Sequence, residues 1–162
     1  MRLTTNHSNS TIILTIVVAM ALRVIPWPRD SFAFNPDWVL LFVIYWCLTT
    51  PERFGIGSAW VVGLLTDVLT GQLLGQYALS YAVAAYITVR LHRRLRAFPL
   101  SQQMLTVLAL SLLSQLLIYW SQSIQGLPRT ESTVWIPSLV GVLLWPVIFA
   151  CLGHLGQKSG FR

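Results

Sequence analysis

Long apolar segments alternate with short polar or proline-containing stretches along almost the whole chain. Each segment is long enough to span a bilayer, or nearly so, and short connections favour antiparallel neighbours packed as a bundle. Prolines mark two of the boundaries, with Pro26 and Pro28 after the first segment and Pro51 after the second. The pattern predicts an all-α bundle of six transmembrane helices, at residues 10–25, 37–50, 54–69, 73–91, 101–124 and 133–155.

Five spans are the alternative to six. The second and third segments are short, although tilting of a helix and local thinning of the bilayer accommodate short spans. Cutting the third and fourth segments differently would give five spans and an external C-terminus. The first segment contains Ala19-Met20-Ala21, which fits a signal-peptide cleavage pattern, but the five apolar segments that follow favour an uncleaved span. We expect one integral membrane domain over residues 1–162.

Composition supports the membrane interpretation. Of the 162 residues, 55% are hydrophobic and only 10% are charged, and the mean hydropathy is +0.65. A soluble domain carries roughly 25% charged residues to coat its surface. Cys47 and Cys151 lie in apolar segments without CxxC spacing, and the three histidines are scattered. Neither a disulfide nor a metal site is indicated, and no cofactor is expected.

The chain has a net charge of +6, and the positions of its charged residues indicate how it is oriented in a membrane. The bases form no solvated stripe interleaved with aromatic residues, so nucleic-acid binding is not indicated. A cytoplasmic N-terminus would place most bases inside and three acids outside, which is the distribution that the positive-inside rule favours. Both termini are therefore expected on the cytoplasmic side of an inner membrane. The inside bases are Arg2, Arg53, Arg90, Arg93, Arg94, Arg96, Lys158 and Arg162; outside lie Arg29, Asp30, Asp37, Arg129 and Glu131, with Arg23 near the outer end of the first span.

The main cytoplasmic anchor is the basic cluster between the fourth and fifth segments. It comprises Arg90, Arg93, Arg94 and Arg96 and is read as a loop. Fixing the topology is its expected role, and contact with anionic headgroups is the alternative.

Small residues recur every four positions in the third segment. Residues four apart share one helix face, and small side chains there let two helix backbones approach closely. Packing within the chain is the favoured interpretation, with Ser80, Ala84 and Thr88 of the fourth segment as a possible partner face. A docking face for another protein is the alternative. The stripe consists of Gly55, Ala59, Gly63, Asp67 and Gly71.

Asp67 is the one acid within an apolar stretch. A carboxylate inside a membrane is costly unless it is paired or neutral. It could form a proton or cation site, contact a partner, reach headgroup water at the outer end of its helix, or pair with Arg23. We expect a structural or partner-facing role.

The fifth segment carries a polar stripe. Helical spacing places most of its members on one side, which we expect to face protein or a wet cavity. Hydrogen bonding between helices is the simpler interpretation, and a substrate pocket is the alternative. The stripe comprises Ser111, Ser114, Gln115, Ser121, Gln122 and Gln125. Pro146 is expected to bend the sixth helix.

Catalytic motifs are not found in the sequence. It has no HExxH, GxSxG, P-loop or paired-acid pattern, so converging reactive groups are lacking. We therefore expect that the protein is not an enzyme.

Several distinctive strings resemble MreD, the rod shape-determining membrane protein family. They cluster around the first loop and the third span, and the resemblance covers roughly residues 24–155. The strings are Val24-Ile25-Pro26-Trp27-Pro28, Asn35-Pro36-Asp37-Trp38-Val39-Leu40-Leu41, Tyr45-Trp46, Gly55-Ile56-Gly57, Gly63-Leu64-Leu65-Thr66-Asp67-Val68-Leu69-Thr70-Gly71, Leu74-Gly75 and Leu144-Trp145-Pro146.

The resemblance implies a place in the elongasome of rod-shaped bacteria. Such proteins associate with MreC, and together they connect MreB filaments to RodA and its penicillin-binding transpeptidase. The family is also distantly similar to the membrane substrate-binding subunits of energy-coupling-factor transporters. That similarity implies a six-helix bundle of the same kind. It also supports the alternative function, a subunit that binds or transports a small molecule.

Overall fold

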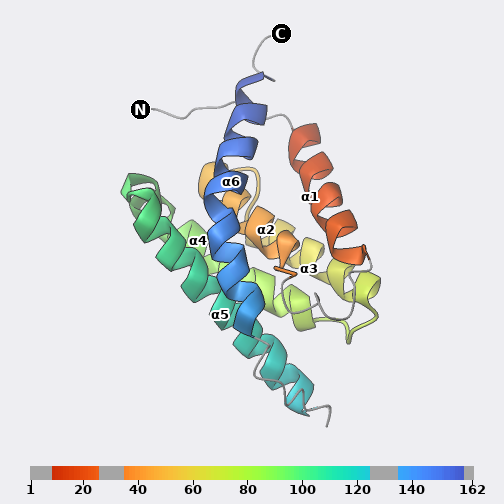
Figure 1. Ribbon diagram of the computed structural model, residues 1–162. Coiled ribbons are helices and arrows are strands. Elements are labelled where there is room, and N and C mark those ends of the chain that lie inside the picture. Colours follow the sequence, from red (N-terminus) through yellow and green to blue (C-terminus); the bar gives the residue numbers. More distant parts are fainter. Residues whose placement is uncertain (1–8, 26–34, 125–134, 159–162) are drawn as a thin grey trace.

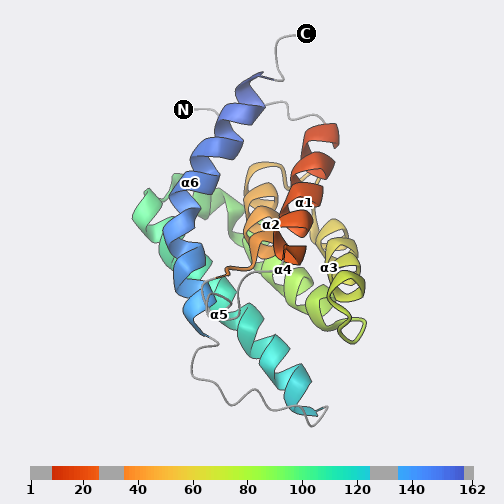
Figure 2. The same cartoon turned by 45° about the vertical axis from the view of Figure 1, so that its right-hand side comes forward.

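The structure, a computed structural model, is all-helical over the residues that it describes (9–25, 35–124 and 135–158, with only the backbone described for 154–158). Six α-helices lie in these ranges, and Figures 1 and 2 show how they are arranged. They are α1 (Asn9–Val24), α2 (Trp38–Thr49), α3 (Ile56–Thr70), α4 (Gln76–Ala97), α5 (Leu100–Ile124) and α6 (Ile136–Lys158).

Most helix ends lie close to the boundaries expected from hydropathy, but α4 continues to Ala97. The basic cluster at residues 90–96 is therefore helical, and its assignment to a loop was wrong. Arginine and leucine are good helix formers, so charge alone does not end a helix. The helix stops at Phe98, the residue before Pro99, because the residue before a proline disfavours the α conformation.

The shortest helix, α2, is the centre of the bundle. Every residue from Val39 to Leu48 is buried, and α2 packs against α1, α4, α5 and α6. In both ribbon views it lies between α1 and α6 (Figures 1 and 2). The indole nitrogen of Trp46 donates a hydrogen bond of 3.0 Å to the Thr15 hydroxyl, which ties α2 to α1.

A tight turn joins α3 to α4, and these two helices share the most extensive packing in the described chain. Gly71 ends α3 with a φ of 64°, and Gly75 precedes α4 with a φ of 104°. Both angles lie in the left-handed region that glycine adopts without steric cost. The Gln72 amide bonds to the Asp67 carbonyl, which is the kind of bond that closes a helix C-terminus.

The surface of the bundle is apolar on several helices, while many of its polar side chains are buried. Exposed large hydrophobic side chains include Leu14, Val68, Leu105 and Leu143, which come from four different helices. Buried polar side chains include Thr66, Asp67, Ser80, Thr88 and Ser114. Of the described helices, α5 and the Ile136–Gly153 part of α6 are long and apolar enough to cross a membrane by length and composition. Pro146 lies within α6.

Candidate functional site

The Asp67 carboxylate caps the N-terminus of α4 from the neighbouring helix. Oδ1 accepts a hydrogen bond from the Tyr77 amide at 2.8 Å, and Oδ2 accepts from the amides of Gly75 at 2.8 Å and Ala78 at 3.3 Å. The first amides of a helix have no partner within it, and its N-terminus favours negative charge. Asp67 is 0% exposed, so it does not reach headgroup water, which was one of the alternatives that the sequence left open.

One turn before Asp67, α3 and α4 come into backbone contact at Gly63. A Cβ added to Gly63 would lie 2.7 Å from the Ala78 nitrogen and 2.8 Å from the Tyr77 carbonyl oxygen. Such a close approach requires a residue without a side chain. Ala59, a further turn back, is fully buried. These positions therefore serve contacts inside this chain.

The two ends of the small-residue stripe do not share that packing. Gly55 and Gly71 are the cap residues of α3, and a Cβ at Gly71 would meet no atom within 4 Å. On α4 the residue against Gly63 is Ala78, whereas Ser80 hydrogen-bonds to Ser114 of α5. Ala84 and Thr88 are buried, and the Thr88 hydroxyl donates to the Ala84 carbonyl.

A second acid, Asp37, joins three helices at the same end of the bundle. Its Oδ1 pairs with Arg23 Nη1 at 2.7 Å, and the Tyr81 hydroxyl donates to both carboxylate oxygens, at 2.8 and 3.0 Å. The Leu40 amide also donates to Oδ1, at 3.2 Å, so Asp37 caps α2. The Arg23 guanidinium lies 4.4 Å from the centre of the Tyr77 ring. We call Arg23, Asp37, Tyr77 and Tyr81 the polar junction.

The polar junction pairs Arg23 with Asp37 and not with Asp67, which was one of the alternatives that the sequence left open. Arg23 ends α1 and Asp37 begins α2, so their side chains meet in a salt bridge across the first connection. The Asp67 oxygens are occupied by the three amides of α4. Tyr77 lies between the two acidic sites. Its amide donates a hydrogen bond to Asp67, and its ring stacks on Arg23, the partner of Asp37.

Part of the polar stripe of α5 is buried between helices. Ser111 and Ser114 are buried, the Ser80 hydroxyl bonds to Ser114, and Gln76 Nε2 donates to the Ile118 carbonyl at 3.1 Å. Ser121 and Gln122 are half-buried. Gln125 lies outside the described residues.

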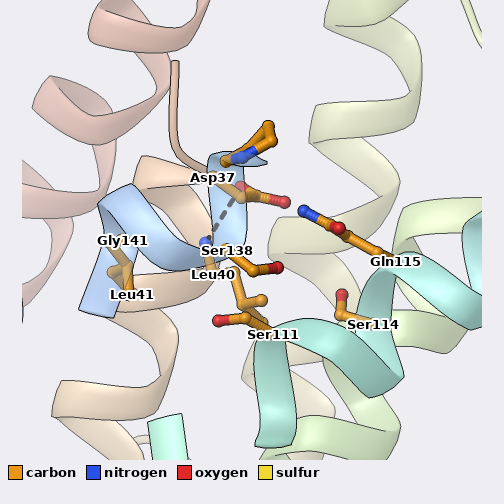
Figure 3. Close-up of a pocket in the computed structure, with 9 residues that line it drawn as sticks. Asp37, Leu40, Leu41, Ser111, Ser114, Gln115, Ser138 and Gly141 are labelled. Carbon is orange, nitrogen blue, oxygen red and sulfur yellow. Dashed lines mark hydrogen bonds between the residues drawn. The ribbon is translucent and has the colours of Figure 1, made fainter. Parts of the chain in front are cut away.

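Part of the same stripe lines a small cavity between α2, α5 and α6 (Figure 3). Its volume is about 10 Å³, which is room for about one water. A drug-sized ligand needs several hundred Å³. The cavity is lined by Asp37, Leu40, Leu41, Ser111, Ser114, Gln115, Pro137, Ser138 and Gly141.

At the opposite end of the bundle, Arg96 caps the C-terminus of α2. Its Nε donates to the Leu48 carbonyl at 2.7 Å, and Nη2 donates to the Thr49 carbonyl. The carbonyl end of a helix favours positive charge. Arg90, Arg93 and Arg94 are exposed. All four arginines of the basic cluster are exposed, and Arg96 also caps α2.

The chain matches the family model of the rod shape-determining protein MreD over residues 5–154. The chain belongs to the MreD family. It is 28% identical over 148 residues to the rod shape-determining protein MreD of Haemophilus influenzae, covering 91% of each chain. No solved structure matches it. Membership of the MreD family assigns the chain a role in determining cell shape.

The orientation of the chain in a membrane depends partly on charges outside the described residues. Arg2, Arg29, Asp30, Arg129, Glu131 and Arg162 lie there, and the side chain of Lys158 is likewise not described. The orientation with both termini inside stays a prediction.

The polar junction of this MreD family member was not predicted from its sequence. Asp37 directly precedes an apolar helix, the position where an N-cap aspartate is expected. Tyr77 and Tyr81 are four residues apart, so they share one face of α4. Those two signals, together with Arg23 at the outer end of the first span, were sufficient to suggest a cluster.

Proposed function

We propose that this MreD family member is a non-catalytic, multi-pass scaffold of the bacterial inner membrane. It acts with MreC to link MreB filaments to RodA and its penicillin-binding transpeptidase. The observation that carries the proposal is the apolar outer surface of several helices, together with polar groups such as Asp67 and Ser80 that are buried and hydrogen-bonded inside the bundle. Lipid is the surrounding that makes such a distribution favourable.

The internal bonds of the two acids support a scaffold. The polar junction and the Asp67 cap bond to groups of this chain, and both hold helices together. The surfaces left for partners are the lateral helix faces and the exposed side chains of Arg90, Arg93 and Arg94. A partner with one membrane span would therefore pack against exposed residues such as Leu65 of α3, Leu116 of α5 or Leu143 of α6.

The proposed orientation follows from the two ends of the bundle. One end holds the polar junction and the Asp67 cap, and the other holds Arg90, Arg93, Arg94 and Arg96. The positive-inside rule places the arginine-rich end in the cytoplasm. Asp37 and Asp67 then lie toward the outer leaflet, and both termini are cytoplasmic. A helix arrangement similar to that of the energy-coupling-factor membrane subunits belongs to the same proposal.

Single-cysteine labelling tests the orientation. In a variant without Cys47 and Cys151, single cysteines are placed at Gln72 in the α3–α4 turn and at Arg94. A membrane-impermeant thiol reagent should label position 72 in intact cells and position 94 only after permeabilisation. Labelling of position 94 in intact cells would overturn the orientation.

Photo-crosslinking tests the scaffold. A crosslinking amino acid is placed at the exposed positions Leu65, Leu116 and Leu143, with buried Ala59 as the matched internal control. At least one exposed position should capture MreC in growing cells, while position 59 should give none. Absence of MreC at all exposed positions, in cells that the variants keep rod-shaped, would contradict the proposed partner.

The alternative of a small-molecule subunit receives no support from the cavity, which has room for about one water.

A further inference from the structure

Two buried polar atoms face the cavity between α2, α5 and α6 without a hydrogen-bond partner among the described residues. They are Ser138 Oγ and Gln115 Oε1. Ser138 is only 2% exposed, so bulk water cannot satisfy its hydroxyl. In Figure 3 the Ser138 hydroxyl points into the space between Asp37 and Gln115, and the Gln115 amide has its nitrogen toward Asp37 and its oxygen farther from it. Leaving a buried polar group without a hydrogen bond is unfavourable, so we expect these two groups to have a bound partner.

The Asp37 carboxylate supplies a third polar atom. Among the described residues Oδ1 accepts from Arg23, Leu40 and Tyr81, whereas Oδ2 accepts only from the Tyr81 hydroxyl. A carboxylate offers about four lone-pair positions across its two oxygens. Oδ2 therefore retains capacity for one more donor.

Size and charge together select the ligand. A volume of about 10 Å³ is close to the least that a single water occupies. A cation would gain little at this position, because the charge of Asp37 is already matched by Arg23 at 2.7 Å. An anion would be repelled by the carboxylate. A neutral molecule that both donates and accepts fits the three groups.

We propose that the cavity is a binding site for one water molecule. The water accepts a hydrogen bond from the Ser138 hydroxyl and donates to Gln115 Oε1 and Asp37 Oδ2. Three hydrogen bonds are typical of a buried structural water. The water thereby extends the polar junction from α1, α2 and α4 to α5 and α6. The proposal concerns the folded chain and does not rest on its role in cell shape.

Radiolytic labelling of the purified full-length protein with ¹⁸O-enriched water tests the site. X-ray pulses convert water into hydroxyl radicals, which modify side chains next to bound water even where bulk solvent is excluded. Leu40 and Leu41 line the cavity and are each 1% exposed. Their modification, measured by mass spectrometry, should exceed that of Leu48, which is buried at 3% outside the cavity.

Two variants connect the labelling to the proposed hydrogen bonds. Ser138→Ala and Gln115→Leu should each lower the modification of Leu40 and Leu41 several-fold. Thr88→Val, which removes a buried hydroxyl bonded within α4, should leave it unchanged. Equal labelling of Leu40, Leu41 and Leu48 in the unaltered protein would overturn the proposal. So would labelling that persists in both Ser138→Ala and Gln115→Leu proteins with unchanged melting temperatures.

Discussion

Gly63 of α3 lies directly against Ala78 of α4, so closely that a Cβ on Gly63 would lie 2.7 Å from the Ala78 nitrogen. The atoms it would meet are backbone, which cannot rotate away as the end of a side chain can. The Ala78 amide also donates to Asp67. The first turn of α4 therefore sets the distance between α3 and α4 and also supplies the amide that bonds to the Asp67 carboxylate.

We predict that Gly63→Ala lowers the melting temperature of the purified protein in detergent. Forcing a methyl group into a filled space costs about 1–3 kcal/mol. Gly57→Ala in the same helix is the matched control, because a Cβ there meets no atom within 4 Å. A Gly63→Ala protein as stable as the Gly57→Ala protein would contradict the close approach.

The Asp67→Asn variant should loosen the start of α4. An amide keeps one acceptor oxygen but loses the charge, and hydrogen bonds to charged groups contribute about 1.5–3 kcal/mol. Hydrogen exchange at the Tyr77 and Ala78 amides should accelerate at least ten-fold. Exchange at amides in the middle of α5 serves as the internal reference. Unchanged exchange at Tyr77 and Ala78 would show that Asp67 does not cap α4.

Arg23 and Asp37 should be strongly coupled. Removing one partner of a largely buried ion pair leaves the other charge uncompensated and costs about 3 kcal/mol. Arg23→Met and Asp37→Asn should each destabilise the protein, and the double variant should lose less than the sum of the two losses. A double-mutant cycle of unfolding free energies measures the coupling, expected at 1 kcal/mol or more. Additive losses would mean that the pair contributes nothing.

Arg96→Gln should destabilise the bundle by about 1 kcal/mol, because α2 loses a cation that caps its last carbonyls. Arg93→Gln removes the same charge one turn earlier, at a position that is exposed as Arg96 is but is not part of the α2 cap, and surface changes of that kind stay within about 0.5 kcal/mol. Melting temperatures of the two variants make the comparison. Equal losses would indicate an effect of net charge and not of the cap.

Hydropathy predicted the helices well because each apolar segment has a length and boundaries that can be read locally. The end of α4 was the exception, since Arg90–Arg96 look like a loop by charge and yet are helical. A helical period also predicted that Ala59, Gly63 and Asp67 share a face. What local pattern cannot give is the rotation of one helix relative to another. That rotation decides that Ala78, and not Ser80, lies against Gly63.

The partner of Arg23 shows the same limit in the polar residues. Asp37 and Asp67 were both expected near the outer surface of the membrane. Their depth in the bilayer could therefore not decide which of them pairs with Arg23. The choice depends on the three α4 amides that occupy Asp67, and such backbone donors have no signature in the sequence. Ser138 likewise reaches the cavity only through the packing of α6 against α2 and α5.

The enclosure of α2 has a consequence for biosynthesis. Three of the helices that surround it, α4, α5 and α6, follow it in the chain and leave the ribosome later. In the proposed membrane location lipid covers its sides during that interval, because these protein neighbours do not yet exist. A helix that is apolar all round satisfies both surroundings in turn, first hydrocarbon and then protein. In that setting the order of synthesis accounts for the lack of a polar face on α2, while α4, which arrives later, brings Tyr81 and Arg96, whose hydrogen bonds fix the two ends of α2.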